Sequence, residues 1–270
     1  MESSPRIKRR FAQRKFEGRP ALVAYLTAGD PSPEATPELA LALERGGADI
    51  LELGVPFSDP IADGPVIQRA SDRALHAGAT VARVLDIASR IREKSEMPIV
   101  LFSYMNPLLR FGFDRLGEEA ARRGIDGVLL TDLSVEEAAE PVAQLRRHGL
   151  DTVFLAAPTS TERRLKLVAE YSSGFIYVVS RTGVTGEQDS VAAGVAPLVE
   201  KIRALSELPV AVGFGVSRAE HVQAIGQYAD GAVVGSALMR LVEEHGSDPG
   251  LPARLEAFAR ELTTPAEAPQ

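Results

Sequence analysis

The chain has 270 residues, of which 45% are hydrophobic and 25% charged, and this is enough for one sizeable core. Its formal net charge is −7, which disfavours a nucleic-acid partner because phosphate backbones are bound by basic faces. The chain has no cysteine, which excludes disulfides, cysteine-ligated zinc and cysteine nucleophiles.

The first segment, MESSPRIKRRFAQRK, is basic and lacks the apolar core of a signal peptide. We expect an amphipathic helix here, with Ile7 and Phe11 facing the protein, Phe16 as a third candidate, and the Arg and Lys side chains solvated. No apolar run approaches the roughly 18 residues that cross a bilayer. The expectation is a cytoplasmic protein with no membrane segment.

Eight short apolar runs of β type follow, most of them separated by amphipathic helical patterns. The predicted strands cover residues 21–26, 49–55, 98–104, 126–132, 151–157, 174–180, 209–215 and 231–237. Strict alternation of strand and helix predicts a parallel sheet, and eight units in about 250 residues favour a single (β/α)8 TIM barrel with an extra N-terminal helix. We expect the barrel domain to span 1–262 and a disordered tail to span 263–270. The alternative is an open doubly wound sheet, although the first strand is not followed by GxGxxG.

The second predicted strand contains a carboxylate, Glu52, within the stretch LELGVPFSDPIADGP (51–65). Side chains alternate along a strand, so Leu51, Leu53 and Val55 suit the helix layer and Glu52 points into the barrel. Burial of an unpaired carboxylate costs several kcal/mol or raises its pKa, and a carboxyl that titrates near neutrality suits acid–base catalysis. The alternative is a structural Glu that is hydrogen-bonded to neighbouring Ser, Thr or Tyr groups.

Glycine-rich segments follow the last two strands, GFGVSRAEHVQAIG (213–226) and GSALMRLVEEHG (235–246), with helices expected to begin at Ser217 and Ser236. Backbone N–H groups at a helix start bind anions, and a phosphate site after strands seven and eight is frequent in such barrels. The alternative is that these glycines only make tight turns. The loop SRTGVTGEQDS (180–190) is typical of a mobile lid, or else of an ordinary disordered loop.

Lysine and histidine are missing from the predicted strand ends. The five lysines and four histidines fall in the N-terminal segment or in helical patterns. This placement argues against a Schiff-base aldolase and against a metal site built from histidines, and no metal is expected. What remains is cofactor-free acid–base chemistry on a small phosphorylated substrate.

Ordered motifs along nearly the whole chain then resemble one family. They are LELGVPFSDPIADGPVIQRAS, YLTAGDP (25–31), SYMNPLLRFG (103–112), GVLLTDL (127–133), LAAPTS (155–160), VVSRTGVTG (178–186), VGFGVS (212–217) and VVGSAL (233–238). This set resembles the tryptophan synthase α chain family. The resemblance implies a lyase of tryptophan biosynthesis that cleaves indole-3-glycerol phosphate to indole and glyceraldehyde 3-phosphate by a retro-aldol reaction.

The resemblance also implies roles for particular residues. Glu52 matches the family's catalytic glutamate, which protonates indole C3 and takes the proton of the 3′-hydroxyl, and Asp63 matches the carboxylate that stabilises the indole N–H. Residues around the indole are Tyr25 (Phe in the enterobacterial pattern), Phe102, Leu129 and Tyr177, with core packing as the alternative. The phosphate cradle matches Gly186, Phe214, Gly215, Gly235 and Ser236.

A partner is implied by the same resemblance, namely the tryptophan synthase β chain in an α2β2 complex. This chain shows no PLP lysine, so PLP is expected in the β chain. Asp59, on the loop after the second strand, and Thr185, in the lid of residues 180–190, match positions that couple this loop to the lid. Asn106 and Pro107 match a partner-facing segment. The rival hypotheses are a catalytically weak allosteric subunit, another phosphate-binding barrel, and a free-standing indole producer.

Overall fold

The computed structural model describes residues 5–179, 188–213 and 215–264, with only the backbone for 188–193. Its eight strands are β1 (Ala21–Thr27), β2 (Ile50–Gly54), β3 (Ile99–Ser103), β4 (Gly127–Leu130), β5 (Asp151–Ala156), β6 (Ile176–Val179), β7 (Val210–Gly213) and β8 (Gly231–Val234). All strand pairs are parallel, and β1 also pairs with β8, so the sheet closes into a barrel. The predicted TIM barrel is confirmed, and the open doubly wound alternative is excluded.

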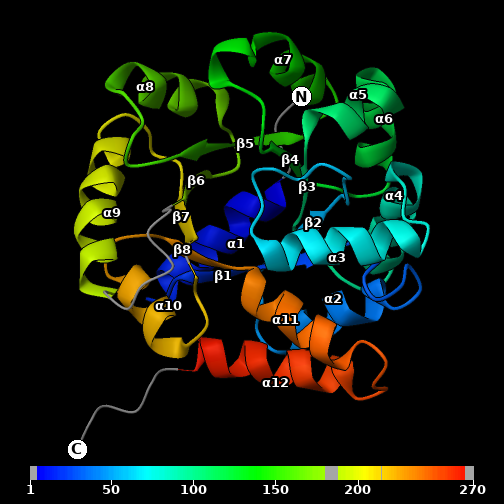
Figure 1. Cartoon of the computed structure of the whole chain (residues 1–270). Coiled ribbons are helices and arrows are strands. Elements are labelled where there is room, and N and C mark those ends of the chain that lie inside the picture. Colours follow the sequence, from blue (N-terminus) through cyan, green and yellow to red (C-terminus); the bar gives the residue numbers. More distant parts are fainter. Residues whose placement is uncertain (1–4, 180–187, 214, 265–270) are drawn as a thin grey trace, which may run out of the picture.

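Helices surround the strands on the outside, apart from α1, which lies across one end of the barrel (Figure 1). They are α1 (Pro5–Phe16), α2 (Thr36–Arg45), α3 (Pro65–His76), α4 (Val81–Arg92), α5 (Met105–Phe111), α6 (Phe113–Arg122), the 3-10 helix η1 (Val135–Glu137), α7 (Ala139–Arg147), α8 (Glu162–Tyr171), α9 (Gln188–Arg203), α10 (Ala219–Gly226), α11 (Ser236–His245) and α12 (Leu251–Thr263). Thr80 and Thr161 cap α4 and α8 by accepting hydrogen bonds from the backbone N–H of Arg83 and Arg164. No helix in the described ranges is long and apolar enough to cross a membrane.

The buried apolar side chains form two cores, one outside and one inside the ring of strands. The larger lies between the strands and the helices and includes Leu51, Leu53 and Val55. The smaller fills the barrel interior, where Ile50 of the same strand lies. Because successive side chains of β2 point to opposite sides, Glu52 shares the interior face with Ile50, as the sequence predicts.

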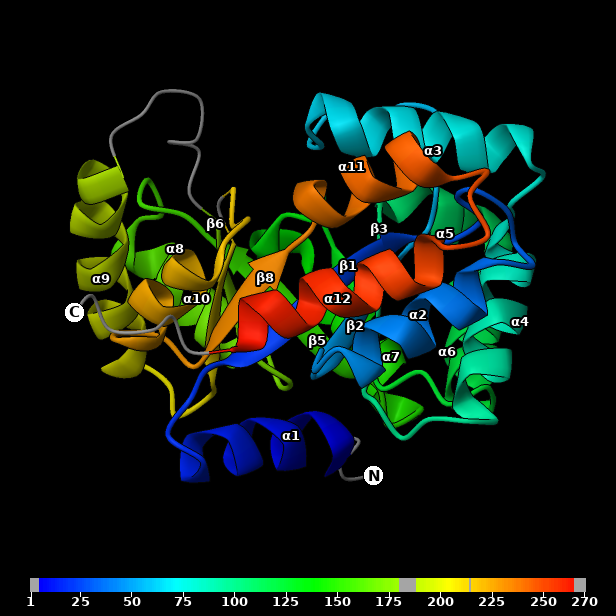
Figure 2. The ribbon, with the colours of Figure 1, turned by 90° about the horizontal axis from the view of Figure 1, so that it is seen from below.

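Helix α1 closes the end of the barrel at which the strands begin (Figure 2). Ile7 and Phe11 are buried in the interior core, as predicted, but the expectation for Phe16 is wrong, because this side chain is 94% exposed. The expectation that all basic side chains of this helix are solvated is also wrong. Arg14 is buried and forms an ion pair with Asp49, because a buried carboxylate at the start of a strand needs a cationic partner.

The domain boundary stays a prediction. Helix α12 runs one residue into the segment expected to be a tail, and residues 265–270 lie outside the described residues. In Figure 2, α3 and α11 lie toward the opposite end from α1, the end at which the strands finish. In barrels of this fold that end carries the functional loops.

Candidate active site

A cavity of about 490 Å³ opens at the C-terminal end of the barrel. Its wall is formed by Tyr25, Glu52, Ala62, Asp63, Gly64, Ile67, Phe102, Thr131, Leu155, Tyr177, Val179, Gly213, Gly215, Val216, Val233, Gly235, Ser236, Ala237 and Arg240. These residues come from the ends of most strands and from the loops after β2, β7 and β8. The cavity therefore collects both predicted carboxyls and part of the predicted phosphate cradle.

Glu52 lines this cavity from β2. Strand register pairs it with Tyr25 of β1 and Val100 of β3, and only 1% of the residue is exposed. Burial raises the pKa of Glu52 from about 4.5 to about 8. Its Oε1 atom has no hydrogen-bond partner among the described residues, which disfavours the alternative of a hydrogen-bonded structural Glu.

Asp63 faces the same cavity from the loop between β2 and α3. Its backbone N–H donates to the carbonyl of Pro60 at 3.0 Å, and the side chain of Gln68 donates to the Asp63 carbonyl at 2.9 Å. Burial raises the pKa of Asp63 to about 6, and a hydrogen bond from Tyr104 counteracts part of that rise. The two carboxyls therefore titrate on either side of neutral pH, which suits one for a proton donor and the other for an anion.

Aromatic side chains line the same cavity as Glu52. The rings of Tyr25 and Phe102 meet edge to face, with centroids 5.2 Å apart, and the Tyr25 and Thr27 hydroxyls lie 3.1 Å apart in a hydrogen bond. The Tyr25 hydroxyl, which the enterobacterial pattern lacks, thus has a hydrogen-bond partner inside the protein. A Cβ at Gly54 would lie 2.3 Å from this hydroxyl oxygen, so only glycine leaves room for it.

Tyr177 and Leu129 differ in their placement. Tyr177 lines the cavity, and the pKa of its hydroxyl is raised by burial and by the nearby charges of Glu52 and Asp63. Leu129 does not line the cavity: it is fully buried in the interior core, where Phe102 packs against that core and is its register partner on β3. The structure shows Leu129 packed in this core, and its predicted contact with the indole stays a prediction.

The predicted phosphate cradle is described in part. Gly215, Gly235 and Ser236 line the cavity, and α11 begins at Ser236 as predicted. The helix after β7 begins later than predicted, at Ala219. Gly186 and Phe214 lie outside the described residues. The first turn of α11, whose backbone N–H groups have no partner within the helix, therefore borders the cavity that holds the two carboxyls.

Three of the four residues predicted for coupling, Asp59, Asn106 and Pro107, follow the ends of β2 and β3. Asp59 is exposed and accepts a hydrogen bond from the Ser58 hydroxyl at 2.6 Å, whereas its predicted neighbour Thr185 lies outside the described residues. Asn106 and Pro107 form the first turn of α5, with Asn106 exposed and Pro107 half-buried. The roles of these residues stay predictions.

Sequence reasoning missed three polar residues of the site. Tyr104 follows β3 and contacts the loop of Asp63, Thr131 follows β4, and Arg240 lies one turn into α11. Their positions at or just after strand ends were a usable signal for the first two. Arg240 had no such signal, because its spacing from Ser236 matters only once α11 is placed over the cavity.

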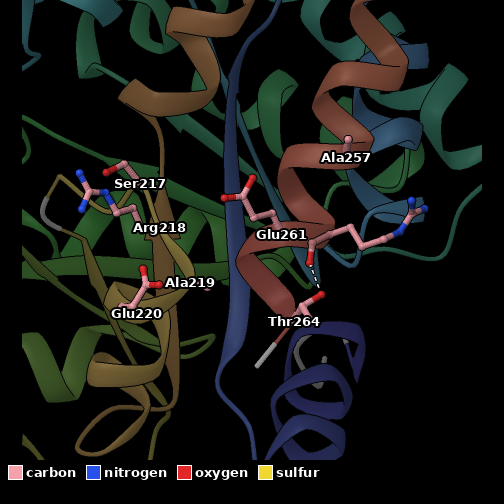
Figure 3. Close-up of a pocket in the computed structure, with 8 residues that line it drawn as sticks. Ser217, Arg218, Ala219, Glu220, Ala257, Glu261 and Thr264 are labelled. Carbon is pink, nitrogen blue, oxygen red and sulfur yellow. Dashed lines mark hydrogen bonds between the residues drawn. The ribbon is translucent and has the colours of Figure 1, made fainter. Parts of the chain in front are cut away.

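A second and larger hollow, of about 780 Å³, lies on the outer surface between α10 and α12 (Figure 3). Arg218 and Glu220 come from the α10 side and Glu261 from α12, and all three are exposed. The hydrogen bond drawn there joins the Thr264 hydroxyl to the Arg260 carbonyl at 2.8 Å and belongs to the end of α12. With no buried titratable side chain, this hollow does not resemble a reaction site.

The closed barrel and its cavity, with one buried and one half-buried carboxyl of raised pKa beside a helix N-terminus, define an acid–base enzyme of the (β/α)8 class. The family model described as "Tryptophan synthase alpha chain" matches residues 11–266. The tryptophan synthase alpha chain of Solibacter usitatus is 62% identical over 257 residues, covering 95% of this chain and 96% of the relative. That of Geobacter sp. strain M21 is 50% identical over 240 residues, covering 89% of this chain and 90% of the relative.

Solved structures agree with this result. Tryptophan synthase subunit alpha of Legionella pneumophila superposes with a TM-score of 0.88 at 34% identity, covering 95% of this chain and 96% of that one. A chain from the tryptophan synthase a2b2 complex of Pyrococcus furiosus gives 0.85 at 40% identity, covering 90% and 98%. The chain therefore belongs to the tryptophan synthase alpha chain family. It is a lyase subunit that cleaves indole-3-glycerol phosphate to indole in tryptophan biosynthesis.

Proposed function

We propose that Glu52 and Asp63 are the catalytic residues of this cleavage. Glu52 donates and accepts the protons, and the Asp63 carboxylate stabilises the positive charge that develops on the indole ring. The observation that carries the proposal is the buried Glu52 Oε1, which has no hydrogen-bond partner among the described residues and lies in the same cavity as Asp63. Because its pKa is about 8, Glu52 is largely protonated at neutral pH and suits a general acid.

In the first step Glu52 donates its proton to C3 of the indole ring. The ring becomes an indoleninium cation, whose charge centres on the ring nitrogen. Asp63, ionised above a pKa of about 6, accepts a hydrogen bond from this N–H and stabilises the cation. A fixed carboxylate beside developing positive charge lowers the barrier as an oxyanion hole does, with the signs reversed.

In the second step the ionised Glu52 takes the proton of the 3′-hydroxyl, which sits on the carbon attached to the ring. The carbon–carbon bond breaks, its electron pair restores the neutral aromatic indole, and the former alcohol carbon becomes the aldehyde of glyceraldehyde 3-phosphate. Glu52 ends the cycle protonated, as it began. The apolar wall of Tyr25, Phe102 and Tyr177 suits the flat indole ring.

We also propose that the chain works in the cytoplasm with a tryptophan synthase β chain in an α2β2 complex, and that PLP is bound by that partner. Support comes from the Pyrococcus furiosus relative, which is described in an a2b2 complex. The exposed positions of Asp59 and Asn106 fit a partner-facing role.

The test follows glyceraldehyde 3-phosphate release from indole-3-glycerol phosphate, with and without a tryptophan synthase β chain. We expect the β chain to raise the wild-type rate. Glu52→Gln should lower kcat by about 10²–10⁴-fold and Asp63→Asn by about 10²–10³-fold. Glu118→Gln, an exposed change on α6, is the matched control and should keep the wild-type rate.

Three outcomes would contradict the proposal in different ways. A wild-type rate no higher than that of Glu52→Gln would indicate an allosteric subunit with weak catalysis. A high rate that the β chain leaves unchanged would indicate a free-standing indole producer. Loss of activity in Glu118→Gln as well would mean that the effects of the other variants are not specific to the cavity.

A further inference from the structure

Arg240 lies on α11, four residues after Ser236, and lines the same cavity as Gly235 and Ser236. Residues four apart lie on one face of a helix. The guanidinium therefore belongs to the side of α11 that carries the predicted phosphate cradle.

Arg240 forms no ion pair within the described parts of the chain, although acidic residues follow it on α11. The carboxylate of Glu243, three residues on, accepts two hydrogen bonds from Arg69, at 2.6 and 2.8 Å, and one from Arg73 at 2.9 Å. Arg73 in turn pairs with the buried Asp30. This four-residue network neutralises its own charges, so Arg240 keeps an uncompensated positive charge.

Arg240 supplies positive charge to a cavity that has to bind an anionic substrate. The described wall of this cavity contains two carboxyls, of which Asp63 is the one that is largely ionised at neutral pH, and Arg240 is the one cationic side chain among those described residues. The whole chain also carries a formal net charge of −7. A phosphorylated substrate must therefore approach against repulsion, and backbone N–H groups at a helix start supply only a partial charge.

We propose that Arg240 binds the phosphate group of the substrate at the start of α11 and attracts the anion to the cavity. The ligand chemistry is a phosphate monoester held by backbone N–H groups of the cradle and by the Arg240 guanidinium. The proposal rests on the function proposed above, which supplies the phosphorylated substrate. The phosphate group takes no part in the bond cleavage, so it is bound equally well in the ground state and in the transition state. Loss of a contact to this group should therefore raise KM and leave kcat unchanged.

The kinetic test compares wild type, Arg240→Gln, Arg240→Lys and the control Arg90→Gln, in the presence of the β chain. Arg90 is exposed on α4 and does not line the cavity, so its replacement removes the same charge at a remote place. We expect Arg240→Gln to raise KM about tenfold with kcat within about twofold, and Arg240→Lys to lie between it and wild type because lysine keeps the charge without the fork. The fall of kcat/KM with added salt should be weaker in Arg240→Gln than in Arg90→Gln.

A second test needs no catalysis and follows the thermal stabilisation of each protein by inorganic phosphate and by glycerol 3-phosphate. Stabilisation of wild type and Arg90→Gln, with about tenfold more ligand needed by Arg240→Gln, supports the proposal even if the chain fails to cleave its expected substrate. Unchanged KM and unchanged ligand stabilisation in Arg240→Gln would overturn it while the cleavage stands. Failure of wild type both to cleave the substrate and to bind either phosphate would overturn both proposals.

Discussion

Tyr104, at the end of β3, holds the loop that carries Asp63. Its hydroxyl accepts a hydrogen bond from the backbone N–H of Ala62 at 2.9 Å. The same hydroxyl donates a hydrogen bond to the Asp63 carboxyl, and this bond holds the pKa of Asp63 below the value that burial alone would give. The Tyr104 ring packs on Phe57 of the same loop, with centroids 5.2 Å apart. One buried side chain thus fixes both the position and the charge of Asp63.

Replacing Tyr104 by Phe should therefore change the pH dependence of the cleavage. Asp63 has to be ionised and Glu52 protonated, so kcat/KM should fall below about pH 6 and above about pH 8. Loss of the donor raises the pKa of Asp63, which moves the acidic limb to higher pH and lowers the rate about tenfold near that limb. The measurement is the pH profile of kcat/KM in the presence of the β chain.

The basic limb, which reports Glu52, should stay in place in Tyr104→Phe. Tyr171→Phe is the control, because Tyr171 packs on Phe154 away from the cavity. A uniform loss of rate at every pH would contradict the expectation and leave Tyr104 with a packing role only.

Glu52 should destabilise the folded protein at neutral pH. Burial raises its folded pKa from 4.5 to about 8, so between these values the unfolded carboxyl has lost its proton while the folded one keeps it. The unfolded state binds fewer protons in this window, and stability falls as pH rises through it. Glu52→Gln cannot ionise, and at about 1.4 kcal/mol per pKa unit it should be more stable than wild type by up to about 3 kcal/mol at neutral pH.

Urea unfolding at several pH values measures this difference. The gain in Glu52→Gln should grow from about pH 5 to about pH 8, whereas Glu118→Gln on the exposed face of α6 should show no such growth. A gain that is the same at all pH values would mean that burial of the charge is not its cause.

The strand and helix rhythm made the barrel predictable, and alternation along β2 made the inward direction of Glu52 predictable. Local patterns could not show what depends on tertiary placement. Phe16 is different, because the helical period already places it on the far face of α1: it follows Phe11 by five residues, roughly 140° around the helix, and its ring is left in solvent. The burial of Asp63 depends on Tyr104 from another strand, and the part played by Arg240 depends on how α11 meets the cavity. Such features follow from the closed barrel and could not be predicted from the periodicity of the sequence.

Arg73 and Asp30 form a second relationship with a measurable consequence. Arg73 donates to both carboxylate oxygens of Asp30, at 2.9 and 2.7 Å, and Asp30 is only 1% exposed. Arg73→Met leaves a buried carboxylate without its partner, which should lower the free energy of unfolding by roughly 2–3 kcal/mol, less than for a fully buried pair because the Arg73 side chain is 33% exposed. Urea unfolding would measure the loss.

Adding Asp30→Asn to Arg73→Met should restore part of the stability, because the unpaired charge is then gone. Arg45→Met is the control: Arg45 also pairs with two residues, Glu38 and Glu256, but on the surface, and its loss should cost less than about 1 kcal/mol. A cost for Arg73→Met as small as that for Arg45→Met would show that the Asp30 pair contributes no more than a surface pair.

Helix α1 offers a matched pair of phenylalanines for a test of how the barrel is closed. Phe11 is 3% exposed and its ring lies 5.6 Å from that of Phe175 in the barrel interior, whereas Phe16 of the same helix is 94% exposed. Phe11→Ala should lower the free energy of unfolding by about 3–5 kcal/mol, since it removes buried apolar surface and leaves a cavity. Phe16→Ala should change it by less than about 0.5 kcal/mol. Because α1 lies at the end of the barrel opposite the two carboxyls, the Phe11→Ala protein that remains folded should keep the wild-type KM, and a raised KM would show that this plug also shapes the cavity.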